Sequence, residues 1–286
     1  MLIVCLIAYP LMVTAAISDH LTPASVLAHA LLLQQEARLV PGYAGSLGFG
    51  VDPVVWTLSL EALFYLLLPL VAGIFWRRPW LCVGLALALG IAGRVALGDG
   101  SGREAGVLLS SFPLHLNDFA AGMGAAMLYV RWRERDAPWQ PPPWLAAAVA
   151  AGGAGAALLL LVAAGGADAG LVRDAVRRDA ALMALLPFAF ATAILGLALA
   201  PAKLRRPFEL APVRWVGTVS YGVFLVHYPV LLFGRTTLDI LHDGSTDAFL
   251  ALTAFALPAS LLLGWLSWVA IERPARRWAQ PAQQRT

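Results

Sequence analysis

Residues 52–75 read DPVVWTLSLEALFYLLLPLVAGIF, an almost uninterrupted apolar stretch that contains a single acidic side chain after its first residue, Glu61. A helix of about 20 apolar residues is long enough to cross the hydrocarbon core of a bilayer. An ionised carboxylate is costly there, so by default it indicates a pathway or a site. Residues 216–233, VGTVSYGVFLVHYPVLLF, repeat the arrangement with His227. These stretches predict membrane-spanning helices that carry polar groups inside the bilayer.

The composition indicates the same class of protein. Of the 286 residues, 60% are hydrophobic and 13% are charged. A soluble domain cannot cover that much apolar surface, whereas lipid surrounds a polytopic membrane protein. We therefore predict a single domain over residues 1–286, an all-α integral membrane bundle of about eight transmembrane helices. The predicted spans are 1–17, 54–75, 79–97, 109–130, 144–164, 179–200, 215–234 and 248–271.

The basic residues predict an orientation. If the N-terminus is cytoplasmic and every span crosses, the cytoplasmic connectors and the C-terminal tail hold 13 of the 20 basic residues. Both termini are therefore expected in the cytoplasm, although the arginines of 173–178 oppose this locally. The net charge of +3 arises from these flanking arginines and indicates no nucleic-acid partner. Cys5 and Cys82 lack the spacing of metal ligands, and we predict no metal site.

Five polar side chains are predicted at similar depth in one half of the membrane. At about 1.5 Å per helical residue, Glu61 and His227 each lie roughly 10 Å from the outer ends of their spans. His115 and Asp118 occupy a similar level in the fourth span, and Arg94 is slightly shallower in the third. The spacing therefore predicts that these groups share one polar region.

Each of these residues also has a purely structural interpretation. Glu61 can neutralise Arg94 without any chemistry. His227 can donate to a backbone carbonyl and do nothing else. His115 and Asp118 are three residues apart and can be local helix partners.

Two further patterns concern helix faces. Thr57, Glu61 and Tyr65 recur every four residues and predict a polar stripe that faces protein or a water-filled cavity. The small residues of 144–164 can allow close helix packing, or the segment can be a spacer helix of little specificity.

Four separated segments carry distinct motifs. They are DPVVWTLSLEALFYLLLP at 52–69, SFPLHLNDFAAGMGAAM at 111–127, VRWVGTVSYGVFLVHYPVL at 213–231 and GWLSWVAIERPARRW at 264–278. In this order, and over nearly the whole chain, they resemble the motifs of the membrane-bound acyltransferase family 3 proteins. The likeness includes a Trp-(Ser/Thr)-Leu-x-x-Glu segment, a Phe-x-x-Gly segment, a Gly-x-x-Ser-Tyr…Leu-x-His-x-Pro segment and a terminal Glu-x-Pro.

The resemblance implies an activity. Members of this family acylate sugars, polysaccharides and macrolides, so we expect an acyl group, acetyl above all, to move from acyl-CoA to an acceptor hydroxyl. Acyl-CoA is then the donor substrate, no bound cofactor is expected, and the acceptor is a carbohydrate or glycolipid. The expected location is the plasma (inner) membrane of a bacterium. Arginines that can attract the phosphates of CoA, but that topology alone also explains, are Arg131, Arg133, Arg135, Arg205 and Arg206.

The resemblance also assigns roles to residues. His227 and Glu61 are the expected catalytic residues, because a neutral imidazole is suited to deprotonate a hydroxyl near pH 7. Glu272 and Pro274 form the terminal structural motif. The expected substrate-binding residues are Trp56, Arg94, His115, Asp118, Ser220 and Tyr221.

The chain departs from the family pattern at its N-terminus. Family members usually have ten spans, and their first helix carries a basic residue followed by a histidine regarded as catalytic. If the full protein has this histidine, that residue is the better candidate for the base, and Glu61 or His227 would then orient groups or bind the acceptor. The opening MLIVCLIAYPL resembles their third helix, with Tyr9-Pro10 as its aromatic-proline pair. We expect a start assigned too far downstream or a fragment, and the alternative is an inactive truncated relative. A different class, a transporter or flippase with Glu61, Arg94 and His227 as its polar pathway, explains the buried charges but not the four motifs.

Overall fold

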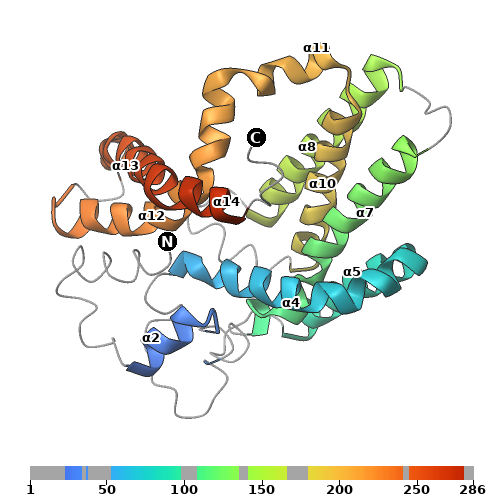
Figure 1. Cartoon of the computed structure of the whole chain (residues 1–286), viewed down its shortest axis with the longest axis horizontal. Coiled ribbons are helices and arrows are strands. Elements are labelled where there is room, and N and C mark those ends of the chain that lie inside the picture. The colour runs from blue at the N-terminus through green and yellow to red at the C-terminus, as the bar shows by residue number, and fades with distance from the viewer. Residues whose placement is uncertain are drawn as a thin grey trace. The chain divides into compact units, whose positions relative to one another are not determined.

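The computed structural model describes residues 23–33, 37, 53–97, 108–134, 141–165, 180–240 and 245–279. Within these ranges every regular element is helical (Figure 1), which confirms the all-α prediction. The helices are α2 (Pro23–Ala30), α4 (Trp56–Arg77), α5 (Pro79–Leu97), α7 (Leu116–Arg133), α8 (Pro143–Gly165), α10 (Ala180–Leu199), α11 (Ala202–Arg205), α12 (Ala211–Thr236), α13 (Thr246–Ser267) and α14 (Arg273–Ala279). Short 3₁₀ turns are η2 (Pro53–Val55), η3 (Phe112–His115) and η4 (Arg206–Glu209), and η5 (Trp268–Glu272) is a π-helical turn.

Within the described ranges, five helical segments are long and apolar enough to cross a membrane. They are Trp56–Arg77, Pro79–Leu97, Pro143–Ala163, Ala211–Thr236 and Thr246–Trp278. These coincide with five of the eight predicted spans, and the chain is an integral membrane protein.

The other predicted spans have different outcomes. The segment 179–200 forms α10, of which Ala184–Leu199 is a shorter apolar stretch. The segment 109–130 is divided, because η3 precedes the regular helix α7. The segment 1–17 lies outside the described residues.

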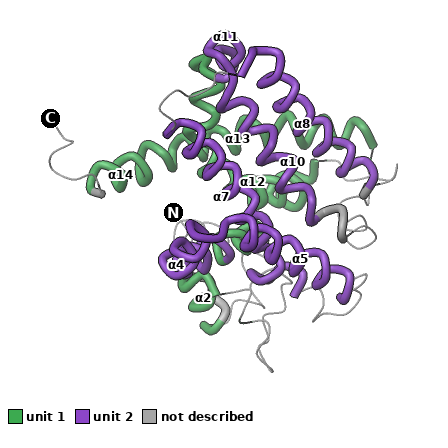
Figure 2. Tube along the Cα trace, turned by 90° about the vertical axis from the view of Figure 1, so that its right-hand side faces the viewer, with its two compact units in different colours: residues 1–59, 209–286 green, residues 60–208 purple. Residues whose placement is uncertain are grey.

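The chain forms two compact units, which Figure 2 distinguishes by colour. Unit 1 comprises residues 1–59 and 209–286, and unit 2 comprises residues 60–208. The boundary falls within α4. The single domain expected from the sequence stays a prediction.

Unit 2 is built on a close crossing of α8 and α10, which lie side by side (Figure 1). A Cβ atom on Gly153 would lie 2.7 Å from the carbonyl oxygen of Ala189, and one on Gly196 would lie 2.7 Å from the Cα of Ala150. Glycine therefore lets the two backbones touch. The small residues of 144–164 form a specific packing face, as the packing interpretation predicted.

The rest of unit 2 places α5 and α7 against each other and against α10. Phe64 of α4 stacks on Phe119 of α7, with ring centroids 4.0 Å apart and planes inclined by 9°. This contact ties the part of α4 that belongs to unit 2 to α7.

Unit 1 is organised around α12 and α13, which pack along each other. A Cβ atom on Gly222 would lie 2.8 Å from the carbonyl oxygen of Gly264, so this crossing also requires glycine. A small cluster of buried side chains, Val55, Leu58 and Leu225, packs the start of α4 against α12.

Candidate functional site

A polar cluster of two buried and two partly exposed side chains lies where α5 ends and α7 begins, within unit 2. We define the polar cluster as Arg94, His115, Asn117 and Asp118. The Arg94 guanidinium donates from Nη1 to the carbonyl oxygen of Leu114 at 2.8 Å, to that of Gly90 at 3.2 Å and to Asn117 Oδ1 at 3.4 Å. Arg94 is only 5% exposed, so these acceptors replace the water that its charge would otherwise require.

Glycine creates the space for this arrangement on α5. A Cβ atom on Gly90 would lie 2.8 Å from Asn117 Oδ1 and 3.1 Å from Arg94 Nη1. A Cβ atom on Gly93 would clash with the side chain of Leu114. The sequence of α5 thus admits η3 and the first turn of α7 close to its own backbone.

Asn117 is a member of the cluster that the sequence analysis missed. Its side chain is fully buried, and its Nδ2 donates to the carbonyl oxygen of Ala184 in α10 at 3.0 Å. Asn117 therefore connects α5, α7 and α10. Its membership could have been predicted from its position beside Asp118, because a carboxamide in an apolar helix is rarely left without hydrogen-bond partners.

His115 and Asp118 form a direct pair in the cluster. His115 Nδ1 lies 2.7 Å from Asp118 Oδ2, and His115 Nε2 lies 3.1 Å from the carbonyl oxygen of Leu109. A carbonyl oxygen only accepts, so Nε2 must carry a hydrogen. The short contact to Asp118 needs a second proton, on the imidazole or on the carboxyl. The pair therefore holds one proton between two side chains, and the predicted local partnership is confirmed.

Asp118 also supplies the negative charge nearest to Arg94 in this cluster, since it interacts electrostatically with the guanidinium. The predicted convergence of Arg94, His115 and Asp118 is thus confirmed within unit 2.

Glu61 has a different environment. Its side chain is exposed, and so is that of Tyr65 one turn later. In the part of the chain that the structure describes, no ion pair joins Glu61 to Arg94, so the neutralising pair that the sequence allowed is not formed there. Thr57, the first residue of the predicted stripe, donates to the carbonyl oxygen of Val54 at 3.2 Å. That the stripe of Thr57, Glu61 and Tyr65 faces protein or a water-filled cavity stays a prediction.

His227 lies within α12 of unit 1 and is half-buried. Its Nδ1 lies 2.7 Å from the carbonyl oxygen of Phe224, and this oxygen can only accept. Nδ1 therefore carries the hydrogen, and in the neutral imidazole the lone pair is on Nε2. The expected bond to a carbonyl is confirmed, and it fixes the tautomer in which Nε2 can accept a proton.

Three other predicted substrate-binding residues also lie in unit 1. Ser220 and Tyr221 are exposed on α12, and the Ser220 hydroxyl donates to the carbonyl oxygen of Gly217 at 2.9 Å. Trp56 begins α4. The structure gives them positions, and their contact with a substrate stays a prediction.

The terminal motif coincides with a change of helix geometry. Glu272 ends the π-helical turn η5, and Pro274 is the second residue of α14. Arg273 between them lies over the ring of Trp268, with its Cζ 5.6 Å from the centroid. Proline lacks the amide that a continuous helix would use, so the π turn accommodates a residue that would otherwise break the hydrogen-bond pattern.

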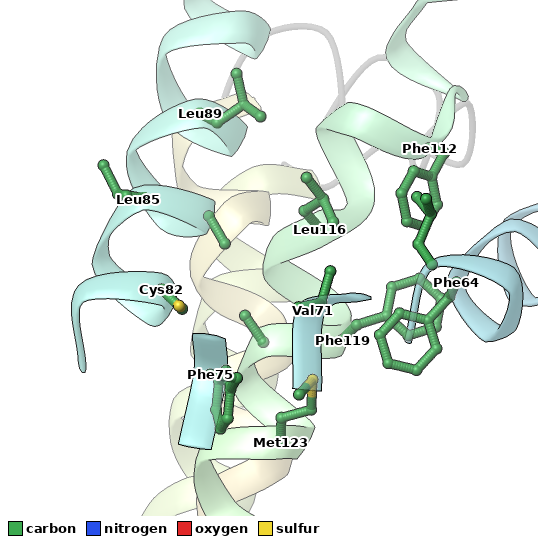
Figure 3. A pocket seen from close by; sticks show the side chains of 13 residues that line it. Phe64, Val71, Phe75, Cys82, Leu85, Leu89, Phe112, Leu116, Phe119 and Met123 are labelled. Carbon is green, nitrogen blue, oxygen red and sulfur yellow. The ribbon is translucent and has the colours of Figure 1, made fainter. Parts of the chain in front are cut away.

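An apolar cavity of about 230 Å³ lies beside the polar cluster in unit 2. Figure 3 shows Leu85 and Leu89 of α5 on one side of it and Phe112 and Phe119 on the other. Phe112 belongs to η3, the same turn that ends at His115. The cavity and the polar cluster are therefore positioned by one short turn. Among the described residues no group of three or more His, Cys, Asp or Glu side chains is placed to hold a metal ion.

Comparisons with known proteins give the family. A family model of an acyltransferase domain, acyltransferase family 3, matches residues 1–268. The peptidoglycan O-acetyltransferase OatA of Listeria monocytogenes serovar 1/2a is 34% identical over 74 residues, which are 26% of this chain and 11% of that protein. The chain thus aligns with about a tenth of the length of this relative. No solved structure gives a significant match. Because the family match covers nearly the whole chain, the protein belongs to the membrane acyltransferase family 3.

Proposed function

We propose that this protein transfers an acetyl group from acetyl-CoA to a hydroxyl of a cell-surface carbohydrate polymer. The family match over residues 1–268 carries the proposal. The similar Listeria protein is named as a peptidoglycan O-acetyltransferase, which supports an envelope polysaccharide as the acceptor. The proposed location is a bacterial inner membrane with both ends of this chain in the cytoplasm, in keeping with the distribution of basic residues.

His227 is proposed as the general base. In the neutral tautomer fixed by Phe224, Nε2 accepts the proton of the acceptor hydroxyl as its oxygen attacks the thioester carbon. The tetrahedral oxyanion then collapses, the carbon–sulfur bond breaks, and the imidazolium returns its proton to the leaving CoA thiolate. The products are an ester and free CoA, and the imidazole is restored.

Glu61 is proposed to orient the acceptor, and Trp56, Ser220 and Tyr221 are proposed to bind it. The geometry supports a different role for Arg94. Its Nη1 is engaged by acceptors of η3 and of its own helix, so Arg94 is proposed to hold η3 in place rather than to contact substrate.

The test is acetylation in cells that produce the full protein. Acetate released by mild alkali from isolated surface polymers measures ester formation, and membrane immunoblots measure the amount of protein. We expect His227→Gln to lower ester formation on the order of 10²–10⁴-fold, the usual contribution of a general base. Glu61→Gln is expected to lower it as well.

Thr218→Ala on the same helix is the matched control, because its hydroxyl only bonds back to the carbonyl oxygen of Arg214. Normal acetylation by His227→Gln would refute the assignment of the base. Solute uptake that depends on a proton gradient and needs no acetyl-CoA would instead favour a transporter.

A further inference from the structure

A second pocket of about 290 Å³ lies at the C-terminal ends of α7 and α10, within unit 2. We call it the end pocket. This volume is just below the roughly 300–1,000 Å³ typical of small-molecule sites. The end pocket is therefore large enough for one part of a larger ligand. Its lining residues are Tyr129, Trp132, Arg133, Pro141, Ala198, Leu199, Ala200, Pro201 and Arg205.

Two guanidinium groups from separate elements converge on the end pocket. Arg133 comes from the last turn of α7, and Arg205 comes from α11. Among the described residues that line the pocket, none carries a carboxylate. The C-terminal ends of α7 and α10 each contribute a partial negative charge of about half a unit, which two full positive charges exceed. The end pocket therefore favours an anion, and paired arginines are well suited to phosphate oxygens.

Aromatic rings give the end pocket a second property. The rings of Tyr129 and Trp132 have centroids 5.8 Å apart, and the Arg133 Cζ lies 5.8 Å from the centroid of Tyr129. Aromatic faces bind nucleobases by stacking, in a manner that tolerates any base. A phosphate-binding pair of arginines beside two rings fits a nucleotide better than a bare anion.

We propose that the end pocket binds the adenosine phosphate part of the acyl-CoA donor. The identity of the donor rests on the proposed function, whereas nucleotide binding itself does not. A lipid headgroup offers the same phosphate chemistry without a base, so the experiment must separate these two sources.

The experiment measures binding of adenosine 3′,5′-bisphosphate to the full chain in phosphatidylcholine nanodiscs by isothermal titration calorimetry. We expect Arg133→Gln and Arg205→Gln each to weaken binding about tenfold, as expected for loss of a charge-assisted hydrogen bond. Lys203→Gln is the matched control, because Lys203 is an exposed basic residue of α11 that does not line the end pocket. This variant is expected to change the affinity by less than about twofold, since water and salt screen a charge that lies outside the pocket from the bound nucleotide.

Two further measurements identify the ligand. Inorganic pyrophosphate is expected to bind more weakly than the nucleotide, because it cannot stack on Tyr129 and Trp132. Nanodiscs with phosphatidylglycerol are expected to leave nucleotide affinity unchanged within a few-fold at physiological salt. Undetectable nucleotide binding, or equal affinity of the pocket and control variants, would overturn the proposal. Complete displacement of the nucleotide by the anionic lipid would assign the pocket to lipid and overturn it too.

The outcome for the end pocket is distinguishable from that for the proposed function. If the nucleotide binds and its binding depends on Arg133 and Arg205, but no acetyl transfer occurs, the assignment of the end pocket is supported and the proposed function is refuted. If acetyl transfer occurs and the KM for acetyl-CoA is the same in the wild type, Arg133→Gln and Arg205→Gln, the proposed function is supported and the assignment of the end pocket is refuted.

Discussion

Replacing Gly153 by alanine should weaken the crossing of α8 and α10, although alanine is the better helix former. The added Cβ would lie 2.7 Å from the carbonyl oxygen of Ala189 and 2.9 Å from the Cα of Ala193. Favourable carbon contacts are about 3.5–4.0 Å, so both approaches are too close. Because the opposing atoms are backbone, relief requires the two helices to move apart.

The magnitude follows from two opposing terms. Alanine gains about 1 kcal/mol over glycine in a helix interior. Forcing an extra carbon into a well-packed contact costs about 1–3 kcal/mol. Gly155→Ala on the same helix is the matched control, because no atom lies within 4 Å of its added Cβ. Subtracting the two variants removes the helix-propensity term and leaves about 1–3 kcal/mol in favour of Gly155→Ala.

The assay is thermal unfolding of the full chain in detergent, followed by fluorescence-detected size-exclusion chromatography. At roughly 2–4 °C per kcal/mol, as for somewhat smaller proteins, Gly153→Ala should unfold about 2–12 °C below Gly155→Ala. Equal midpoints would refute the close crossing, because a loosely packed pair of helices would accept a methyl group on either residue.

Three other variants test the site and its surroundings. Arg94→Met should lower the free energy of unfolding by about 2–3 kcal/mol in the same thermal assay, because three buried acceptors lose their donor, and an unchanged midpoint would contradict this. Phe119→Ala should cost about 3–5 kcal/mol by removing the stacked ring, and the exposed Phe190→Ala should cost far less; equal losses would count against the packing in Figure 3. In a cysteine-free background, Glu134→Cys and Lys203→Cys should both react with a membrane-impermeant maleimide from the cytoplasmic side, and labelling from opposite sides would contradict the predicted topology.

The depth of the polar residues was predictable from the sequence, and their contacts were only partly so. A helix rises by a constant amount per residue, so Arg94, His115 and Asp118 could be assigned to one level from position alone. The three do meet in unit 2. Depth does not specify rotation about the helix axis, and for this reason Asn117, which contacts both Arg94 and α10, was not identified.

The packing face of α8 was predictable only as one of two alternatives. Its apolar residues surround the helix almost evenly, so periodicity indicates no preferred side. The choice depends on Gly196 of α10, which receives the backbone of α8. Information about a glycine contact is therefore divided between two helices that are distant in sequence.

The partner of Arg94 shows why charge counting misleads inside a membrane. The sequence places Glu61 in the span before Arg94 and Asp118 in the span after it, both at a similar depth. Of these two, charge counting suggested Glu61 as the partner of Arg94, because Asp118 already had a local partner in His115. A carbonyl oxygen, however, has two lone pairs, and a helical carbonyl that already accepts one backbone amide can accept a guanidinium as well. Gly90 and Leu114 provide such oxygens, and every residue type carries one, so no sequence pattern reveals them. Because Asp118 supplies the nearby negative charge, the structure gives Glu61 no neutralising task in unit 2, and a costly intramembrane carboxylate without such a task is the stronger candidate for a role in the reaction.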